Sequence, residues 1–205
     1  KKERESIRRL TNINSKVSSH YLIKNNGDII ILVPELYIAW HAGVSFWKNF
    51  KLLNKSSIGI EISNPGHKFK YKRFSKKQIN SLLSLSKFLI KKYKILPQNI
   101  LGHSDIAPNR KKDPGEKFPW KYLAKKNIGF WHNLKKNELN KLRNKKCNKI
   151  LNNKFFSNLY KIGYSKNYKK QNEKLLIKAF QRRFRPRLIN GIIDQECLLL
   201  SKNLI

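Results

Sequence analysis

The sequence has few cysteines and no long apolar run. Cys147 and Cys197 are the only cysteines among 205 residues, too few for a disulfide framework, and their spacing matches no zinc-binding motif. We expect both to pack as small apolar residues. The alternative is one disulfide between them, if the protein lies in an oxidising compartment. No apolar run approaches the roughly 20 residues that a membrane-spanning helix needs, so a transmembrane segment is not expected.

Methionine is absent as well, even at position 1, and no signal peptide is recognisable. The sequence is therefore expected to start downstream of a natural initiation site. A removed targeting segment and a trimmed end would both explain this start.

Acidic residues are also scarce. The chain has 12 of them against 46 lysines and arginines, which gives a formal net charge of +34. Such a charge favours polyanionic partners, of which nucleic acid is the most common. The lysines are spread along the whole chain, however, and they are overused together with asparagine and isoleucine, which is typical of coding bias. Nucleic acid is therefore not the expected partner, although a basic nucleic-acid-binding protein stays the weaker alternative.

Alternating β-branched and apolar residues predict a set of short strands. These strands are predicted over residues 17–24, 29–33, 57–63 and 100–103. The first two are expected to form a hairpin closed by a two-residue turn at Asn26-Gly27, because both residues tolerate a positive φ.

Helices are predicted between and after these strands. A short one is expected around Glu5–Leu10. Ser75 and Gln78 form a capping box, and the apolar residues that follow recur at helical spacing as far as Tyr93. Strand, hairpin, strand, helix and strand in this order predict an α/β fold, with a mixed sheet flanked by helices.

The composition changes from about residue 134. A lysine- and asparagine-rich connector, partly helical, is expected to precede three short helices that form a small helical domain. The signals for these helices are Phe155–Ile162 ended by Gly163, the apolar line Leu176, Phe180 and Phe184, and an N-cap at Asp194.

The loop over residues 102–115 holds the residue types that a metal site needs. His103 can offer an imidazole nitrogen and Asp113 a carboxylate oxygen, and zinc accepts both at about 2.0–2.2 Å. Lys111 would then lie beside the metal, facing a developing oxyanion. The alternative is a solvated basic turn that contains a hydrogen-bonded histidine.

Five stretches of the chain, in one order, resemble the zinc-dependent N-acetylmuramoyl-L-alanine amidases of the AmiD-like branch, which are related to peptidoglycan recognition proteins. They are Val17–Leu22, Leu32–Glu35, Ala39–Gly43, Ser57–Glu61 and Gly102–Trp120. The resemblance implies that zinc-activated water hydrolyses the amide bond between N-acetylmuramic acid and L-alanine of the stem peptide. It also implies a Zn²⁺ cofactor.

The resemblance assigns roles to four residues. His103 and Asp113 match zinc ligands, and Glu61 matches the catalytic glutamate that exchanges protons with the attacking water and the leaving amine. Lys111 matches the residue that stabilises the oxyanion. Without the resemblance, Glu61 and Lys111 are better explained as ordinary surface residues.

Other residues near these motifs have less specific signals. His41 and Trp40 are predicted to contact substrate, with simple packing as the alternative for each. His20 is expected to be structural. Asp105 is expected either to orient His103 or to cap the local turn.

A catalytic zinc normally has three protein ligands. In this family the third is a histidine on a strand that we expect before residue 1, and residues 1–16 contain no histidine. The chain is therefore expected to supply two of the three ligands, and hydrolysis by this chain alone is expected to be slow or absent. A catalytically inactive peptidoglycan-binding protein with the same fold stays open as an alternative.

The resemblance also suggests an order of domains. Residues 1–132 are expected to form the amidase domain, 133–149 a basic linker and 150–205 a helical peptidoglycan-binding domain. The last assignment rests on Ala179–Gln181, Phe184–Pro186 and Gly191–Asp194, which resemble the domain appended to AmiD-like amidases.

The expected partners follow from the same resemblance. They are peptidoglycan or muropeptides, whose stem-peptide carboxylates suit a basic surface, and the expected location is the bacterial cell envelope or periplasm. A monomer is expected.

Overall fold

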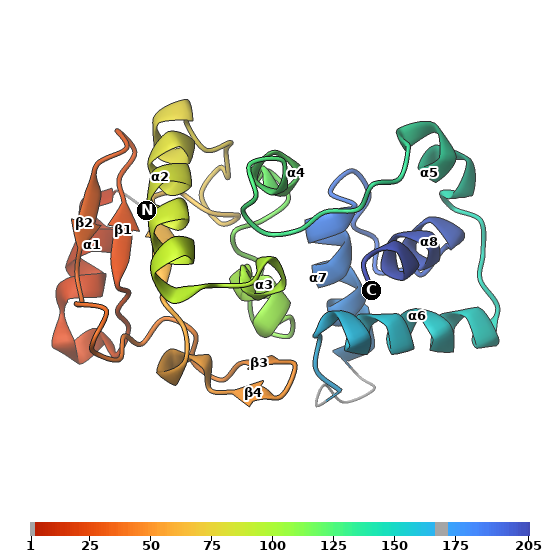
Figure 1. Cartoon of the computed structure of the whole chain (residues 1–205), viewed down its shortest axis with the longest axis horizontal. Coiled ribbons are helices and arrows are strands. Elements are labelled where there is room, and N and C mark those ends of the chain that lie inside the picture. The colour runs from red at the N-terminus through yellow and green to blue at the C-terminus, as the bar shows by residue number, and fades with distance from the viewer. Residues whose placement is uncertain (1–2, 167–171) are drawn as a thin grey trace. The chain divides into compact units, whose positions relative to one another are not determined.

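A computed structural model describes residues 3–166 and 172–205 of the chain (Figure 1). Its internal contacts divide the chain into two compact units. The first consists of residues 1–45 and 51–96, and the second of residues 46–50 and 97–205. These units are defined by contacts within the chain. The predicted domain boundaries at 132 and 150 rest on resemblance to other proteins, and they stay a prediction.

The first unit is built on a small mixed sheet. Its central strand, β1 (Tyr21–Ile23), is antiparallel to β2 (Ile29–Ile31) and parallel to β5 (Ile60–Ile62). All three residues of β1 are buried, so this strand lies in the core of the unit. Helices α1 (Glu3–Thr11) and α2 (Lys76–Tyr93) belong to the same unit, and α2 lies beside β1 (Figure 1). The predicted mixed sheet flanked by helices is confirmed.

The turn between β1 and β2 differs from its prediction. The N–H of Lys24 donates to the carbonyl of Asp28 at 2.9 Å, so the loop has three residues, Asn25 to Gly27, and the predicted two-residue turn is wrong. Gly27 adopts a φ of 94°, which glycine reaches without steric cost. Asn26 instead uses its side-chain amide to donate to the Asp28 carboxylate at 2.7 Å.

Helix α2 begins as its sequence predicts. The Ser75 hydroxyl accepts the N–H of Gln78 at 3.2 Å, and the Gln78 side chain accepts the N–H of Ser75 at 3.0 Å, which completes the capping box. The predicted buried face is confirmed at Ile79, Leu82, Ser86 and Leu89. Tyr93, expected on the same face, is 42% exposed at the end of the helix.

Glu35 joins β1 to the end of α2. The hydroxyls of Tyr21 and Tyr93 donate to its carboxylate, and Lys92 Nζ does so at 2.6 Å. Burial alone would raise the pKa of Glu35, but the hydrogen bonds from Lys92 and the two tyrosines outweigh it and lower this pKa to about 2. The ionised carboxylate therefore stabilises the first unit at neutral pH.

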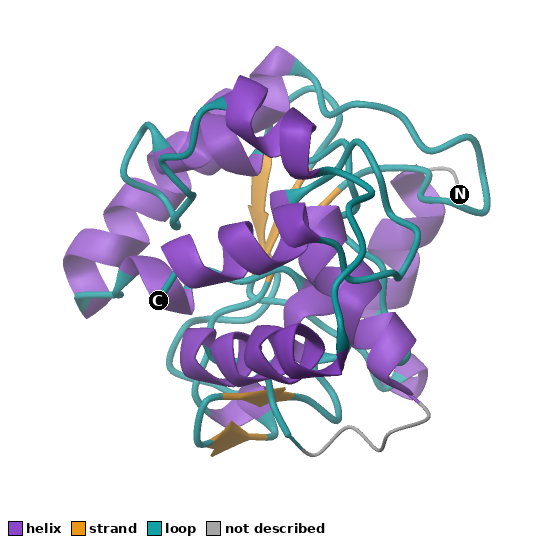
Figure 2. Cartoon of the chain, turned by 90° about the vertical axis from the view of Figure 1, so that its right-hand side faces the viewer, coloured by secondary structure: helices purple, strands orange, loops and turns teal. Residues whose placement is uncertain are grey.

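The regular secondary structure of the second unit is mainly helical. Figure 2 shows the helices of the chain in purple, its strands in orange and its loops in teal. Its helices are α3 (His103–Ile106), α4 (Trp120–Ala124), α5 (Lys136–Leu142), α6 (Lys149–Ile162), α7 (Glu173–Phe184) and α8 (Gln195–Asn203). The short strand β3 (Phe46–Trp47) also belongs to it, and β3 pairs with β4 (Phe50–Lys51). The predicted strand over 100–103 is wrong, because the Asp105 side chain accepts the N–H of Gly102 and His103 begins a helical turn.

The three C-terminal helices follow their predicted signals. Gly163 ends α6 with a φ of 137°, and Asp194 caps α8 by accepting the N–H of Cys197 at 2.9 Å. Helices α6 and α8 lie side by side (Figure 1), and Phe155 and Phe180 pack edge to face in the core with ring centroids 5.2 Å apart. Both cysteines are free thiols.

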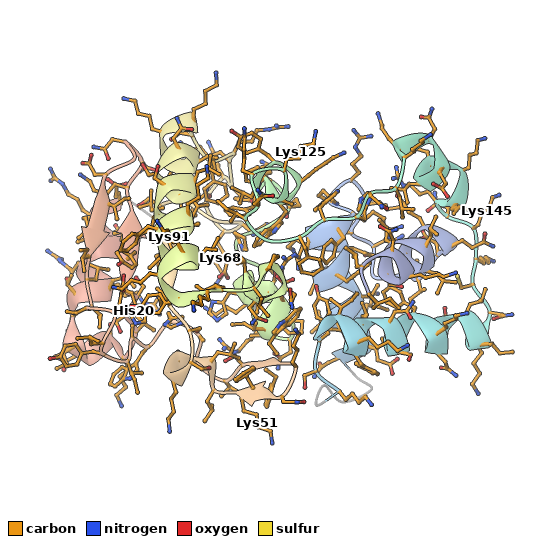
Figure 3. The ribbon with its side chains drawn as sticks, in the orientation of Figure 1. His20, Lys51, Lys68, Lys91, Lys125 and Lys145 are labelled. Carbon is orange, nitrogen blue, oxygen red and sulfur yellow. The ribbon has the colours of Figure 1, made fainter. Side chains whose placement is uncertain are left out.

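Lysines are exposed on both units, as the labelled side chains of Figure 3 show. Exposed examples are Lys51, Lys68, Lys91, Lys125 and Lys145. Within the described ranges, the chain contains no helix that is both long and apolar enough to span a bilayer.

Replacing Glu35 with glutamine should lower the free energy of unfolding by about 1–3 kcal/mol at pH 7, because three donors lose a charged acceptor. The folded-state pKa of about 2 lies below the ordinary 4.5, so this contribution is complete above pH 4.5 and disappears as the pH falls towards 2. Urea unfolding of parent and variant should therefore converge in acid. Glu5→Gln, at an exposed position of α1, is the control, and equal effects of both substitutions would contradict the prediction.

Candidate functional site

The loop predicted to hold a metal brings His103 and Asp113 together. Their Nδ1 and Oδ2 atoms are 3.2 Å apart, with the His103 side chain 14% exposed and that of Asp113 57% exposed. The N–H of Ser104 donates to the carbonyl of Asp113 at 2.9 Å, which ties the two arms of the loop. A Cβ atom on Gly102 would lie 2.7 Å from Cδ of Pro114, so this close approach requires glycine.

The spacing of this pair fits a zinc site. Zinc bonds of about 2.0–2.2 Å in a tetrahedral arrangement place neighbouring ligand atoms roughly 3.3–3.5 Å apart. The observed 3.2 Å is close to that value, and Nδ1 is the imidazole nitrogen that faces Asp113. Among residues 3–166 and 172–205, no group of three or more His, Cys, Asp and Glu side chains could hold a metal ion together. The loop therefore offers two donors.

The charge state of Asp113 suits a ligand. Partial burial opposes its ionisation, but the hydrogen bond from His103 and the positive charge of Lys111 lower the pKa of Asp113 below its ordinary value. The backbone N–H of Lys111 donates to the carbonyl of Ala107 at 3.0 Å, which holds this residue within the same loop as Asp113. The structure thus brings His103, Lys111 and Asp113 into one neighbourhood.

Asp105 caps the turn that contains His103. Its Oδ2 atom accepts the N–H of Gly102 at 2.8 Å, which confirms the capping alternative. Arg183 and Tyr164 also donate to this carboxylate, and sequence reasoning missed both of them. For Arg183 the sequence held one signal. It is a basic residue three positions after Phe180, in a helix whose predicted buried face is apolar.

Glu61 lies in the first unit, at the middle of β5, where it pairs in register with Leu22 of β1. Ile60 and Ile62 are half-buried while Glu61 is exposed, as the alternation of the strand predicts. A carboxylate in this position is held by a paired strand and is open to solvent, as a proton-transfer group requires.

Trp40 and His41 lie in the loop that follows β2. Trp40 is 50% exposed, and its backbone N–H donates to the Ser18 hydroxyl at 2.8 Å. His41 is half-buried, with Nδ1 3.0 Å from the carbonyl of Ala39 and Nε2 2.9 Å from the hydroxyl of Ser57. Trp40 thus presents an aromatic face, while the His41 ring is fixed by contacts within its own unit.

His20, which lies directly before β1, has the structural role that was predicted for it. It is 2% exposed, and its Nδ1 accepts the N–H of Gly59 at 3.0 Å. Nε2 therefore carries the proton and donates to the carbonyl of Tyr37 at 3.1 Å. Its ring lies edge-on to that of His41 with centroids 5.4 Å apart, so the two histidines pack together beside the start of β5.

Comparison with known proteins agrees with these motifs. The profile of the N-acetylmuramoyl-L-alanine amidase family matches residues 1–116. The chain is 37% identical over 204 residues to N-acetylmuramoyl-L-alanine amidase AmiD of Escherichia coli, covering 93% of this chain and 74% of that protein. It is 39% identical over 105 residues to the 1,6-anhydro-N-acetylmuramyl-L-alanine amidase AmpD of the same species, covering 51% of this chain and 55% of that protein.

Solved structures give the same result. The complex of E. coli AmiD with the substrate anhydro-N-acetylmuramic acid-L-Ala-D-γ-Glu-L-Lys matches with a TM-score of 0.86 at 36% identity, covering 98% of this chain and 83% of that one. AmpDh3 of Pseudomonas aeruginosa matches with a TM-score of 0.84 at 32% identity, covering 98% and 86%.

Substituting Gly59 with alanine should displace His41, because the new Cβ would lie 2.3 Å from Cγ of that ring. We expect a loss of about 1–3 kcal/mol in the free energy of unfolding, as for other overpacked sites. A double-mutant cycle with His41→Gly measures it, since removal of both the ring and the Cβ atom, which would lie 2.7 Å from the new Cβ, should recover most of the loss. Simple additivity of the two substitutions would show that the glycine does not accommodate His41.

Proposed function

Because the chain belongs to the N-acetylmuramoyl-L-alanine amidase family, we propose that it hydrolyses the amide bond between N-acetylmuramic acid and L-alanine of the stem peptide. The observation that carries this proposal is the approach of His103 Nδ1 to Asp113 Oδ2 at 3.2 Å. The AmiD complex with an anhydro-muropeptide supports muropeptides as the substrate class.

His103 and Asp113 are the residues proposed to hold zinc. Their donor atoms have the spacing and the chemistry that zinc favours, and Asp113 is ionised at neutral pH. When bound, zinc lowers the pKa of a water ligand to about 7 and polarises the substrate carbonyl. No third ligand is assigned among the described residues.

Glu61 is the proposed general base and acid. Its exposed carboxylate would accept a proton from the attacking water and return it to the amine of L-alanine as the amide bond breaks. Lys111, whose charge already acts on Asp113, would stabilise the oxyanion that forms on the carbonyl oxygen. These two roles divide proton transfer and charge stabilisation between an acidic and a basic side chain.

Trp40 and His41 are proposed to contact substrate. The half-exposed indole of Trp40 can stack on a sugar ring, and the many exposed lysines suit the carboxylates of stem peptides. His41, held through both ring nitrogens, would keep the loop of Trp40 in place and could reach substrate only at its exposed edge.

The proposal extends to the arrangement of the chain and its location. Residues 1–132 would form the amidase domain, 133–149 a basic linker and 150–205 a peptidoglycan-binding domain. The substrate would place the protein in the bacterial cell envelope or periplasm. We propose that it acts as a monomer.

Glu61→Gln should lower muropeptide hydrolysis by roughly 10²–10⁴-fold, because the carboxamide cannot accept the proton of water. Release of peptides headed by L-alanine, followed by chromatography, measures this effect on any version of the chain with measurable activity. Zinc content should not change, since Glu61 is not a proposed ligand. Parental turnover in Glu61→Gln would refute its role, and muropeptide binding without hydrolysis by the parent would favour the inactive binding protein.

His103→Ala and Asp113→Ala should each weaken zinc binding, by at least about tenfold, because each removes one donor. Competition with a chromophoric chelator gives the Kd. His67→Ala, at an exposed histidine outside the loop, is the control. Equal zinc affinity in the parent and in both loop variants would place the metal elsewhere.

A further inference from the structure

Asp105 is buried in the second unit, two residues after His103. Its side chain is 1% exposed, and a carboxylate is stable in such a place only when its charge and lone pairs are satisfied. Oδ2 accepts the N–H of Gly102 at 2.8 Å and Nη1 of Arg183 at 2.5 Å. Oδ1 accepts the hydroxyl of Tyr164 at 2.9 Å. Both side-chain partners come from the C-terminal segment 150–205.

Arg183, on α7, is itself fixed from several sides. Its Nη2 donates to the carbonyl of Ile100 at 3.0 Å, just before the loop. Its guanidinium lies over the ring of Trp120 at 4.2 Å and over that of Phe130 at 4.9 Å, contacts that attract a cation. Helices α3 and α7 lie next to each other (Figure 1). Arg183 thus connects α7 to Ile100 before the loop, to Asp105 within it and to Trp120 after it.

Tyr164 follows the glycine that ends α6. Its ring packs edge-on against Trp47 with centroids 5.1 Å apart. Burial and the neighbouring charge of Asp105 raise the pKa of Tyr164 well above its ordinary value, so the phenol stays protonated and donates a hydrogen bond to the carboxylate. The direction of this hydrogen bond is therefore fixed over the whole neutral range.

Helix α3 transmits the position of Asp105 to the candidate ligands. It has only four residues, His103 to Ile106, so a fixed side chain at Asp105 also fixes the direction of His103 within the same turn. Ser104, between them, donates its N–H to the carbonyl of Asp113 at 2.9 Å. A small rotation of α3 would therefore change the spacing between His103 and Asp113.

We propose that Arg183 and Tyr164 are positioning residues for the amidase reaction, which hold His103 at its distance from Asp113 by fixing the carboxylate of Asp105. This inference rests on the proposed function. It gives the C-terminal helices a part in building the site, in addition to the wall binding proposed for them. Arg183 and Tyr164 act through Asp105, which makes them distinct from the residues proposed to meet substrate.

The same helices contain matched controls for a purely structural role. Arg185, the residue directly after α7, forms buried ion pairs with Asp194 at 2.5 Å and with Glu196 at 3.4 Å. Tyr160, on α6, is a half-buried phenol that lies under the ammonium group of Lys166. Substitutions at Arg185 and Tyr160 remove comparable groups whose described partners do not include Asp105.

The test compares Tyr164→Phe and Arg183→Lys with the controls Tyr160→Phe and Arg185→Lys in the full chain. Tyr164→Phe keeps the ring and its packing while removing the hydroxyl. Arg183→Lys keeps the charge but cannot donate to Asp105 and to the Ile100 carbonyl from two guanidinium nitrogens. Two measurements are made: the imidazole ¹⁵N resonances of His103 without metal, and the Kd for zinc by chelator competition. We expect Tyr164→Phe and Arg183→Lys to shift the resonances and to weaken zinc binding about tenfold, with neither change in the controls.

His103 resonances and a zinc Kd in Tyr164→Phe that match those of Tyr160→Phe would overturn the inference. If the parent chain binds no zinc, the proposed function fails instead. The metal-free resonances of His103 then still decide whether Arg183 and Tyr164 position this ring.

Discussion

The ion pair between Asp105 and Arg183 is the interaction on which the second unit depends. Both side chains are 1% exposed, and burial of two charges is tolerated only when each finds further hydrogen bonds. Gly102 and Tyr164 supply them to Asp105, and Ile100 supplies one to Arg183. Removing either charge would leave the other buried without a counterion, so the loop, α3 and α7 are coupled.

In the first unit, too, a carboxylate largely removed from solvent is stabilised by a cation and by further hydrogen bonds. Glu35 is held by Lys92 and by two tyrosine hydroxyls, which join β1 to the end of α2. In a chain with 46 basic and 12 acidic residues, cations are abundant and carboxylates are scarce. Each buried carboxylate described here accordingly has a basic partner, including Glu196, which pairs with Arg143 at 2.5 Å. The scarce acidic groups thus determine where elements join.

Local signals were enough to predict much of the fold. The capping box at Ser75, the glycine end of α6 and the cap at Asp194 act within a few residues, and the structure confirms all three. The strand predicted over 100–103 failed because Gly102 bonds to a side chain rather than to a neighbouring strand. The motif also indicated His103 and Asp113, whereas the partners of Asp105 lie 59 and 78 residues away, beyond any periodicity.

We propose that the loop places His103 Nδ1 and Asp113 Oδ2 so that both bind one zinc ion. The most direct test is an anomalous difference map at the zinc edge, from crystals of the zinc-loaded protein. We expect a single strong peak about 2.0–2.2 Å from both atoms, with Asp105 still bound to Arg183. A peak at another site, or a His103 ring turned away from Asp113 around an ordered metal, would contradict it.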